Sequence, residues 1–372
     1  MIRRFIDSTL RGVTVFCLLL LLGSPARAVD AIPSEAYARV NDALLLNHVM
    51  PRYRLLARET RGLSDAVAEA CAGSPADNID VLRESYHATM DAWMGVQHLG
   101  FGPVELFMRS YRLYFWPQSR GKVGKAVDEL LESPEALSGA ELADASVAVQ
   151  GLPAVEYMLY GRNSVRGGDS ASRRCTLLAV ITRNMRDMAA AVVSDWRGGD
   201  VNHEASFLQP GPDNTYYSSH ADATLALFRS FHDGLQLIAD VKLKPVLGDS
   251  VDTARPALAE SRRSERAMRN IVLNLEALEA LYLGDGGPGL SELVVAHERD
   301  KALDPLMRKA FRLTLETARS IDTPLTSAVS DKTSRAQVEK LLTRVLALKQ
   351  IVKSRVAPAL SLTVGFNAMD GD

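Results

Sequence analysis

Apolar residues recur every three or four positions along most of the chain, which is the spacing of one face of a helix. One such stripe consists of Leu55, Leu56, Leu63, Val67 and Cys71. Segments in which apolar and polar residues alternate are nearly absent, so no strand is needed to explain the pattern. The sequence therefore predicts an all-α protein. The expected helices lie at about 34–48, 52–72, 79–99, 123–132, 145–160, 172–196, 220–242, 254–283, 291–319 and 332–355.

Three segments of the first half recur in the same order in the second half. The pairs are LLARETR (55–61) with LLAVITR (177–183), GVQ (95–97) with GLQ (234–236), and GLPAVEYMLYG (151–161) with NLEALEALYLG (274–284). Such repeats indicate one structural unit used twice. The sequence thus predicts a duplicated helical bundle, two up-down bundles of about four helices each, over 29–165 and 166–372. A crevice between two such halves is a favoured place for a binding site.

Residues 1–28 have the pattern of a cleaved signal peptide. Two arginines precede an apolar core at 13–22, and SPARA ends in small residues, so cleavage is expected after Ala28. The apolar core is too short for a stop-transfer helix, and no later segment is apolar enough to span a bilayer. The sequence therefore predicts an exported protein of the periplasm or cell envelope, with no membrane span after signal cleavage.

Charge and cysteine content narrow this picture. The chain has a formal net charge of -2 and no basic run, which argues against a nucleic-acid partner. Loss of Cys17 with the signal peptide leaves Cys71 and Cys175. An even pair in an oxidising compartment favours one disulfide, which would join an early helix to a mid-chain helix. The alternative is two unpaired, buried thiols.

Glu156 lies in the apolar run GLPAVEYMLYG, and Glu279 occupies the matching position of the second repeat. A buried carboxylate needs a cation, a metal ion or several hydrogen-bond donors to stay ionised. Glu156 is therefore a candidate metal ligand. The alternative is an architectural role, in which both glutamates accept hydrogen bonds from another helix.

His87 and Asp91 are four residues apart, so they share one face of a helix and could flank a ligand. His48 precedes Met50-Pro51-Arg52 at an expected helix-to-helix corner. Each of the three is a candidate metal ligand, and each could instead be a polar residue with its hydrogen bonds satisfied within the fold.

Arg109 and Arg112 lie among aromatic residues in RSYRLYFWPQSRG. Arginine in such surroundings can stack on rings and bind carboxylates, so both are candidates for ligand binding. The alternative is a packed loop that crosses the end of the bundle. No HExxH helix, CxxC pair set, GxSxG turn or phosphate-binding glycine loop occurs, so no standard catalytic set is present.

Several segments together resemble the imelysin-like family over residues 34–372. They are HVMPRYRLLARET, DAWMGVQHLGFGPVE, YRLYFWPQSRG, SVAVQGLPAVEYMLYG and VGFNAMDGD. The resemblance implies an envelope-associated, duplicated α-helical bundle that is linked to iron regulation or uptake. Members of the family were first classed as metallopeptidases.

The family signature is GxHxxE, whose histidine and glutamate are the proposed metal ligands. Here Gly151 and Glu156 match it, whereas Pro153 stands at the histidine position and has no ligating side chain. A metal site would need His48, His87 or Asp91 as the missing ligand.

These residues favour a non-enzymatic periplasmic protein of iron or other metal acquisition. It would bind iron or another divalent metal, a small chelate or an envelope iron-uptake partner between the bundles. The alternatives are a metallopeptidase of the imelysin type and a purely structural or partner-binding envelope protein.

Overall fold

The computed structural model describes residues 31–73, 75, 77–118, 121–133, 142, 144–161, 171–198, 202–297 and 301–362. These residues contain helices and no strand, which confirms the all-α prediction. None of the helices in these ranges combines the length and the apolar character needed to cross a membrane. The expected cleavage site at Ala28 lies outside the described residues.

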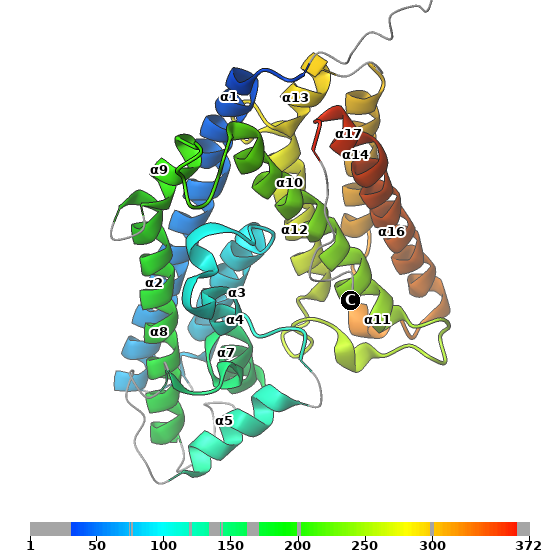
Figure 1. The fold of residues 1–372 in the computed structure, drawn as a ribbon. Coiled ribbons are helices and arrows are strands. Elements are labelled where there is room, and N and C mark those ends of the chain that lie inside the picture. Colours follow the sequence, from blue (N-terminus) through cyan, green and yellow to red (C-terminus); the bar gives the residue numbers. More distant parts are fainter. Residues whose placement is uncertain are drawn as a thin grey trace, which may run out of the picture. The chain divides into compact units, whose positions relative to one another are not determined.

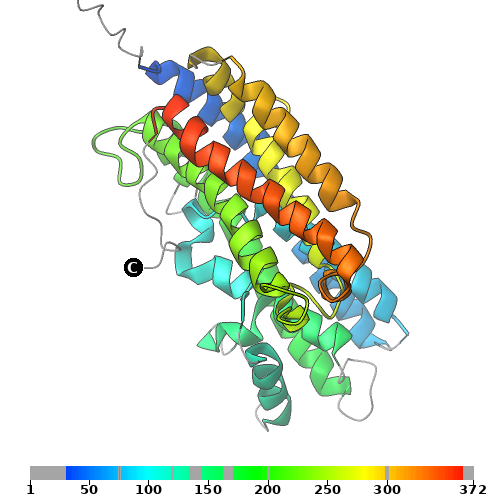
Figure 2. The ribbon, with the colours of Figure 1, turned by 90° about the vertical axis from the view of Figure 1, so that its right-hand side faces the viewer.

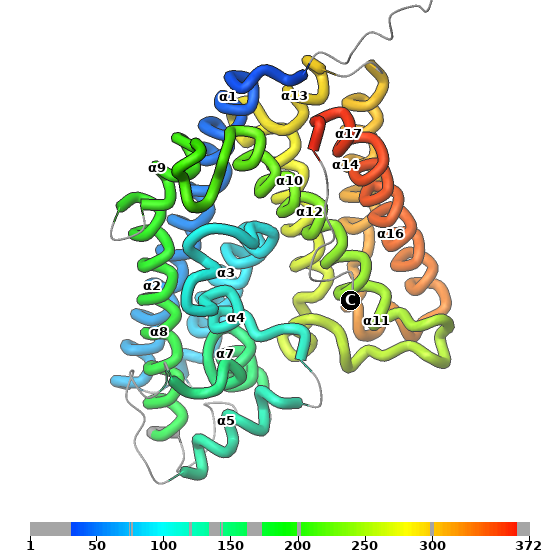
Figure 3. Tube along the Cα trace, viewed as in Figure 1, coloured from blue at the N-terminus to red at the C-terminus, as the bar shows by residue number. Residues whose placement is uncertain are grey.

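Three long helices contain a π-helical turn shortly before a proline. The segments on either side of each turn follow one another along the chain in Figures 1 and 3. The prolines are Pro51, Pro245 and Pro358, and in each helix the residue four positions earlier lies in the wider turn. A proline ring collides with that carbonyl in a regular α-helix, so local widening lets the helix continue. The expected corner at His48 is therefore wrong, because one helix runs through it. The segments are α1 (Ser34–Leu44), η1 (Leu45–Val49) and α2 (Met50–Ala72); α10 (His220–Gln236), η5 (Leu237–Leu243) and α11 (Lys244–Leu247); and α16 (Lys332–Ile351), η7 (Val352–Val356) and α17 (Ala357–Ala359).

Two sets of helices pack around the core. The first helix group is α2, α3 (Ile79–Val96), α7 (Gly151–Tyr160) and α8 (Ala171–Arg197). Helices α3 and α8 each contact both α2 and α7. The second helix group is α10, α12 (Ala267–Leu283), α14 (Leu303–Arg319) and α16, which run side by side in Figure 2. Contacts between α3 and α12 join the two groups.

The helix contacts do not follow chain order. Helix α8 comes after the predicted boundary at 165/166 but packs along α2 and α7, which precede it. Helix α1 comes before that boundary but packs against α10 and α13 (Leu290–His297). The division into two duplicated bundles stays a prediction. The remaining helices are η2 (Gly102–Val104), η3 (Leu106–Met108), α4 (Arg109–Leu113), α5 (Lys122–Glu132), η4 (Val147–Val149), α9 (His203–Leu208), η6 (Pro256–Leu258) and α15 (Leu325–Ala328).

The helix expected at 254–283 begins only at Ala267. The residues before it form turns, in which Ser261 and Glu265 have positive φ angles of 44° and 55°. Non-glycine residues adopt such angles only where their surroundings enforce them. The prediction of a helix is therefore wrong over this segment, named here the 261–266 loop, and its contacts form part of the site described below.

A disulfide joins Cys71 at the end of α2 to Cys175 in the first turns of α8, at a sequence separation of 104. The predicted pairing is confirmed. Because α2 and α8 pack along each other, the disulfide fixes one end of the longest helix pair of the first helix group.

Removing this disulfide is expected to destabilise the fold, because it closes a long loop and restricts the unfolded chain. The double variant Cys71→Ser/Cys175→Ser should lose about 2–4 kcal/mol of unfolding free energy. Urea unfolding of both proteins with and without dithiothreitol measures the difference. The reductant should lower the wild-type midpoint and leave the variant unchanged; equal midpoints for all four samples would contradict the prediction.

Candidate functional site

Helix α7 begins where the backbone of α4 comes very close. Gly151 has a φ of 72°, and a Cβ atom there would lie 2.3 Å from the carbonyl oxygens of Arg112 and Leu113. Only glycine fits this approach. Pro153 follows in the first turn, where a missing N–H removes no helical hydrogen bond. These two residues place Glu156 one turn further on, facing the 261–266 loop.

Glu156 holds that loop against α7. Its side chain is buried, with 6% of the residue exposed. Oε1 accepts hydrogen bonds from the backbone N–H groups of Arg263 (3.1 Å) and Ser264 (3.0 Å) and from the Ser264 hydroxyl (2.8 Å). Burial raises the pKa of Glu156, and the bonds from Ser264 oppose that rise. The glutamate thus receives its donors from a loop rather than from another helix.

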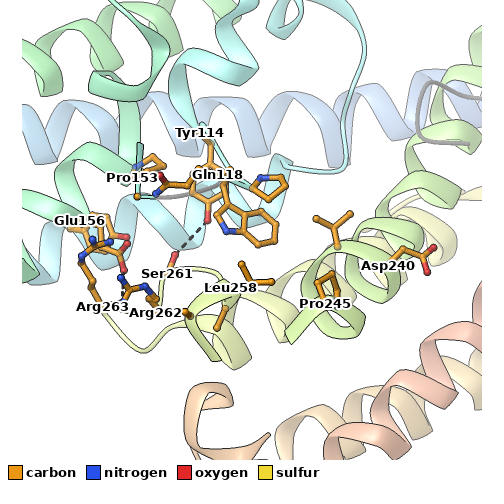
Figure 4. A pocket seen from close by; sticks show the side chains of 17 residues that line it. Tyr114, Gln118, Pro153, Glu156, Asp240, Pro245, Leu258, Ser261, Arg262 and Arg263 are labelled. Carbon is orange, nitrogen blue, oxygen red and sulfur yellow. Dashed lines mark hydrogen bonds between the residues drawn. The ribbon is translucent and has the colours of Figure 1, made fainter. Parts of the chain in front are cut away.

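A cavity of about 370 Å³ opens beside Glu156. Figure 4 shows Pro153 and Glu156 at one end of it and Asp240 and Pro245 at the other. Its wall therefore combines α7 with η5 and α11, and it carries aromatic rings together with two arginines. The lining residues that bear on its chemistry are Tyr86, Tyr114, Trp116, Glu156, Asp240, Arg262 and Arg263.

A buried ion pair lies next to this wall. Lys242 Nζ donates to Glu260 Oε2 at 2.7 Å, and each residue is only 1% exposed. Nζ also donates to Gln97 Oε1 (2.9 Å) and Asn274 Oδ1 (2.6 Å), and the Tyr114 hydroxyl donates to Glu260 Oε1 (2.9 Å). Burial lowers the pKa of Lys242, and Glu260 opposes that decrease. The pair therefore fixes Tyr114 in the cavity wall.

His87 and Asp91 share one face of α3, as their spacing predicts, and both contact arginine. Asp91 is ion-paired with Arg266 and Arg269, and His87 Nδ1 lies 2.7 Å from Arg266 Nη1. His87 Nε2 also lies 2.8 Å from the Tyr160 hydroxyl. Burial alone would raise the pKa of Asp91, but the hydrogen bonds from Arg269 and Arg266 hold it below its usual value.

His48 lies in a different cluster. Its Nε2 is 2.9 Å from Nε2 of His98, and its Nδ1 accepts a hydrogen bond from Arg52 Nε at 3.1 Å. Arg52 also donates to Asp285 at 2.8 Å. Burial lowers the pKa of His48 to about 4, against the opposing effect of Asp285, and burial also places the pKa of His98 well below its usual value.

The structure thus brings His87 and Asp91 together at Arg266 and places Glu156 and His48 in other contacts. Glu156 bonds to the 261–266 loop, His87 and Asp91 bond to arginines, and His48 bonds to His98 and Arg52. Within the described ranges, no group of three or more His, Cys, Asp or Glu side chains is placed to hold a metal ion.

The two candidate arginines for ligand binding are held inside the fold. Arg109 donates to the Pro103 carbonyl (2.9 Å) and to Asp195 (2.7 Å). Arg112 donates to Gln150 (2.9 Å) and to Asn184 (3.2 Å). Neither side chain lines the cavity beside Glu156. These contacts agree with the alternative of a packed loop.

Sequence reasoning missed Lys242, Glu260 and the 261–266 loop. A signal for Lys242 was present, because it continues an apolar helical stripe at Ile238, Ala239, Leu243 and Val246. A charge in the middle of such a stripe indicates a buried, paired group. The sequence contains no comparable signal for Ser264. Its backbone N–H and its hydroxyl reach their acceptor, Glu156, only because α7 packs beside the 261–266 loop.

The two matching glutamates are expected to differ in their contribution to stability. Glu156→Gln replaces a charged acceptor of three hydrogen bonds and should lower the unfolding free energy by about 1–3 kcal/mol. Glu279 is half-buried and has no hydrogen bond to a described residue, so Glu279→Gln should change it by less than about 0.5 kcal/mol. Urea unfolding of both variants at neutral pH measures this; equal losses would favour a shared architectural role.

The buried histidine pair should make stability fall with acidity. His48 and His98 stay neutral in the fold, whereas the unfolded chain takes up protons below its ordinary histidine pKa of about 6.5. Stability contributed by the pair is therefore complete above pH 6.5 and is lost as the pH falls toward 4. The slope should be about 1.4 kcal/mol per pH unit per histidine. Urea unfolding between pH 7.5 and 4.5 tests this, and His98→Gln should reduce the slope; an unchanged slope would contradict it.

Comparison with known proteins agrees with this fold. A family model described as imelysin, peptidase M75, matches residues 49–352. An imelysin-like protein from Psychrobacter arcticum 273-4 is 20% identical, with a TM-score of 0.75 over 91% of this chain and 99% of that one. A protein from Parabacteroides distasonis ATCC 8503, named as an iron-regulated protein A precursor, is 15% identical, with a TM-score of 0.72 over 88% of this chain and 96% of that one. No curated protein matches the chain. The match over most of its length shows that this chain belongs to the imelysin family.

Proposed function

We propose that this imelysin-family protein is a non-enzymatic binding protein of the periplasm that takes a small anionic metal chelate into the cavity beside Glu156. The main observation behind the proposal is that the cavity wall contains an arginine without an ion-pair partner among the described residues, whereas its carboxylates have partners. Arg262 lines the cavity, is exposed and makes no ion pair with a described residue, whereas the carboxylates there are already bonded.

The two lining carboxylates have their own donors. Glu156 accepts three hydrogen bonds from the 261–266 loop, and Asp240 is ion-paired with Lys244 and Lys349 at 2.5 Å each. An incoming anion therefore meets the guanidinium of Arg262 without displacing a partner. This balance favours a negatively charged ligand over a bare cation.

The rest of the wall suits an organic ligand of moderate size. Trp116, Tyr86 and Tyr114 supply aromatic surface, and a volume of about 370 Å³ is typical of small-molecule pockets. Arginine binds carboxylates through two parallel N–H donors and also stacks on rings. A compact metal chelate with carboxylate groups matches both kinds of contact.

A chelate also fits the positions of the candidate metal ligands better than a bare metal ion does. Pro153 replaces the signature histidine, and Glu156, Asp91 and His87 are bonded to the loop or to arginines. A bare ion would have to break several of these contacts, whereas a chelate brings its own ligands. The same contacts support a binding role over a peptidase, since Glu156 Oε1 is already occupied by three donors.

Two further observations support the periplasmic location and the link to iron. The N-terminal segment has the pattern of a signal peptide. The similar protein from Parabacteroides distasonis is named as iron-regulated. Both support a cargo of chelated iron in the periplasm, and envelope iron-uptake proteins are the partners that this role would require.

Calorimetric titration of the mature protein with ferric citrate tests this function, with citrate alone and a ferrous salt alone as separate arms. Arg262→Gln should weaken ferric citrate binding about tenfold, because it removes one charge-assisted contact. Arg61→Gln, which changes an exposed arginine of α2 outside the cavity, should leave binding unchanged. Absence of ferric citrate binding would contradict the proposal, as would tight binding of the ferrous ion that Arg262→Gln does not affect.

A further inference from the structure

A second cavity, of about 320 Å³, lies between the C-terminal end of α3 and helix α10. None of its lining residues belongs to the wall of the cavity beside Glu156. It is named here the α3–α10 cavity. Its lining consists of Gln97, His98, Gly100, Phe101, Ala226, Arg229, Ser230, Asp233, Gly234 and Leu237.

Lys242 sets the orientation of one polar group in this wall. The ammonium group of Lys242 can only donate, so the atom of Gln97 that it contacts at 2.9 Å is the acceptor Oε1. The amide nitrogen of Gln97 is therefore the other end of the side chain. That nitrogen has no hydrogen-bond partner among the described residues, so Gln97 supplies the cavity with N–H donors.

Two successive hydrogen bonds, from Arg52 to His48 and from His48 to His98, determine which nitrogen of His98 carries its proton. Arg52 Nε can only donate, so Nδ1 of His48 accepts at 3.1 Å, and Asp285 at 3.7 Å is too distant to share that atom by a hydrogen bond. A neutral His48 then carries its proton on Nε2 and donates to Nε2 of His98 at 2.9 Å.

His98 must in turn carry its own proton on Nδ1. This atom is buried and has no hydrogen-bond partner among the described residues, and the residue is only 5% exposed. Burial lowers the pKa of both histidines, which agrees with two neutral rings. His98 lines the cavity, and its Nδ1–H is an unsatisfied donor that is itself buried; such a donor is unfavourable until an acceptor reaches it.

Helix α10 contributes the opposite wall. Arg229 is exposed and has no ion pair with a described residue, and the hydroxyl of the buried Ser230 has no hydrogen bond to one. Asp233 is the single carboxylate of the lining, and its Oδ1 lies 3.0 Å from Nδ1 of His232. Phe101 and Leu237 add apolar surface. The cavity thus has a cluster of donors beside an apolar wall.

We propose that the α3–α10 cavity binds a small aliphatic carboxylate. The carboxylate oxygens receive hydrogen bonds from the Gln97 amide and the Ser230 hydroxyl and, after a small rotation of the buried imidazole, from His98 Nδ1, and the charge is balanced by Arg229. The aliphatic part lies against Phe101 and Leu237. A ligand of a few carbon atoms suits a volume at the lower end of small-molecule pockets.

Titration of the mature protein with straight-chain carboxylates from acetate to hexanoate tests this site. Hexanoate should bind saturably, and hexanamide, which keeps the shape but lacks the charge, should bind at least about tenfold more weakly. Arg229→Gln changes an exposed residue and should fold normally, and it should weaken hexanoate binding about tenfold as well. Arg262→Gln, in the other cavity, is the matched control and should leave hexanoate binding unchanged.

Nitrogen-15 NMR of labelled histidine provides an independent readout. The spectrum should show His98 protonated on Nδ1 and His48 protonated on Nε2, and hexanoate should shift the His98 Nδ1–H signal. The proposal is overturned if none of the carboxylates binds, if hexanamide binds as well as hexanoate, or if His98 has the opposite tautomer. Equal weakening by Arg229→Gln and Arg262→Gln would overturn it too. Failure of ferric citrate to bind would leave this site unaffected, because the two cavities share no lining residue.

Discussion

The buried pair of Lys242 and Glu260 is the interaction on which both cavities depend. Removing two charges from water is unfavourable, and a buried pair persists only where further hydrogen bonds satisfy its remaining donors and acceptors. Here Asn274 and Gln97 complete the contacts of the ammonium group, while Tyr114 and Asn270 complete those of the carboxylate. Removing either charge alone would leave its partner buried without compensation, so the pair acts as a unit.

The position of Lys242 follows from the form of the helix that carries it. Lys242 lies in η5, the widened turn that precedes Pro245, three residues before that proline. His48 lies in η1, the corresponding turn before Pro51. A π-helical turn shifts the helix face by part of a turn, so a polar side chain can point into the core while the apolar stripe continues on either side. At η1 and η5 the proline thus has two consequences: it keeps the helix from being regular, and it places a polar group among apolar neighbours.

The sequence was informative about the helices and much less so about the polar contacts. Apolar spacing predicted the positions of α2, α3, α8 and α10, because burial of one face repeats with the helical period. The same spacing wrongly extended α12 backward over the 261–266 loop. That error has a physical origin, since the loop is shaped by Glu156, whose carboxylate takes backbone donors that a helix would otherwise use.

For the candidate site as well, the sequence indicated which residues matter but not which polar contacts they make. The apolar run around Glu156 correctly indicated its burial, although the same pattern around Glu279 leaves that side chain half-buried. The partners of Glu156 could not be predicted, since Ser264 is more than a hundred positions away and meets it only in the folded chain. His48 was predicted as a candidate ligand by itself, and His87 together with Asp91 on one helix face. What each does follows from the arginine that contacts it. Arg52 lies four residues after His48 on the same helix, so local spacing could have suggested that contact, whereas Arg266 is far from His87 in the sequence and meets it only in the folded chain.

The two cavities are joined by a short run of hydrogen bonds that passes through the buried ion pair. Gln97 lines the α3–α10 cavity and accepts from Lys242; Lys242 donates to Glu260; and Glu260 accepts from Tyr114, which lines the cavity beside Glu156. One ammonium group therefore fixes the direction of the Gln97 amide in one wall, and its partner carboxylate fixes the Tyr114 hydroxyl in the other. Because a lysine can only donate and a carboxylate can only accept, neither side chain can reverse while the pair is intact. The polarity of both cavities thus follows from a single buried interaction between η5 and the segment that leads into α12.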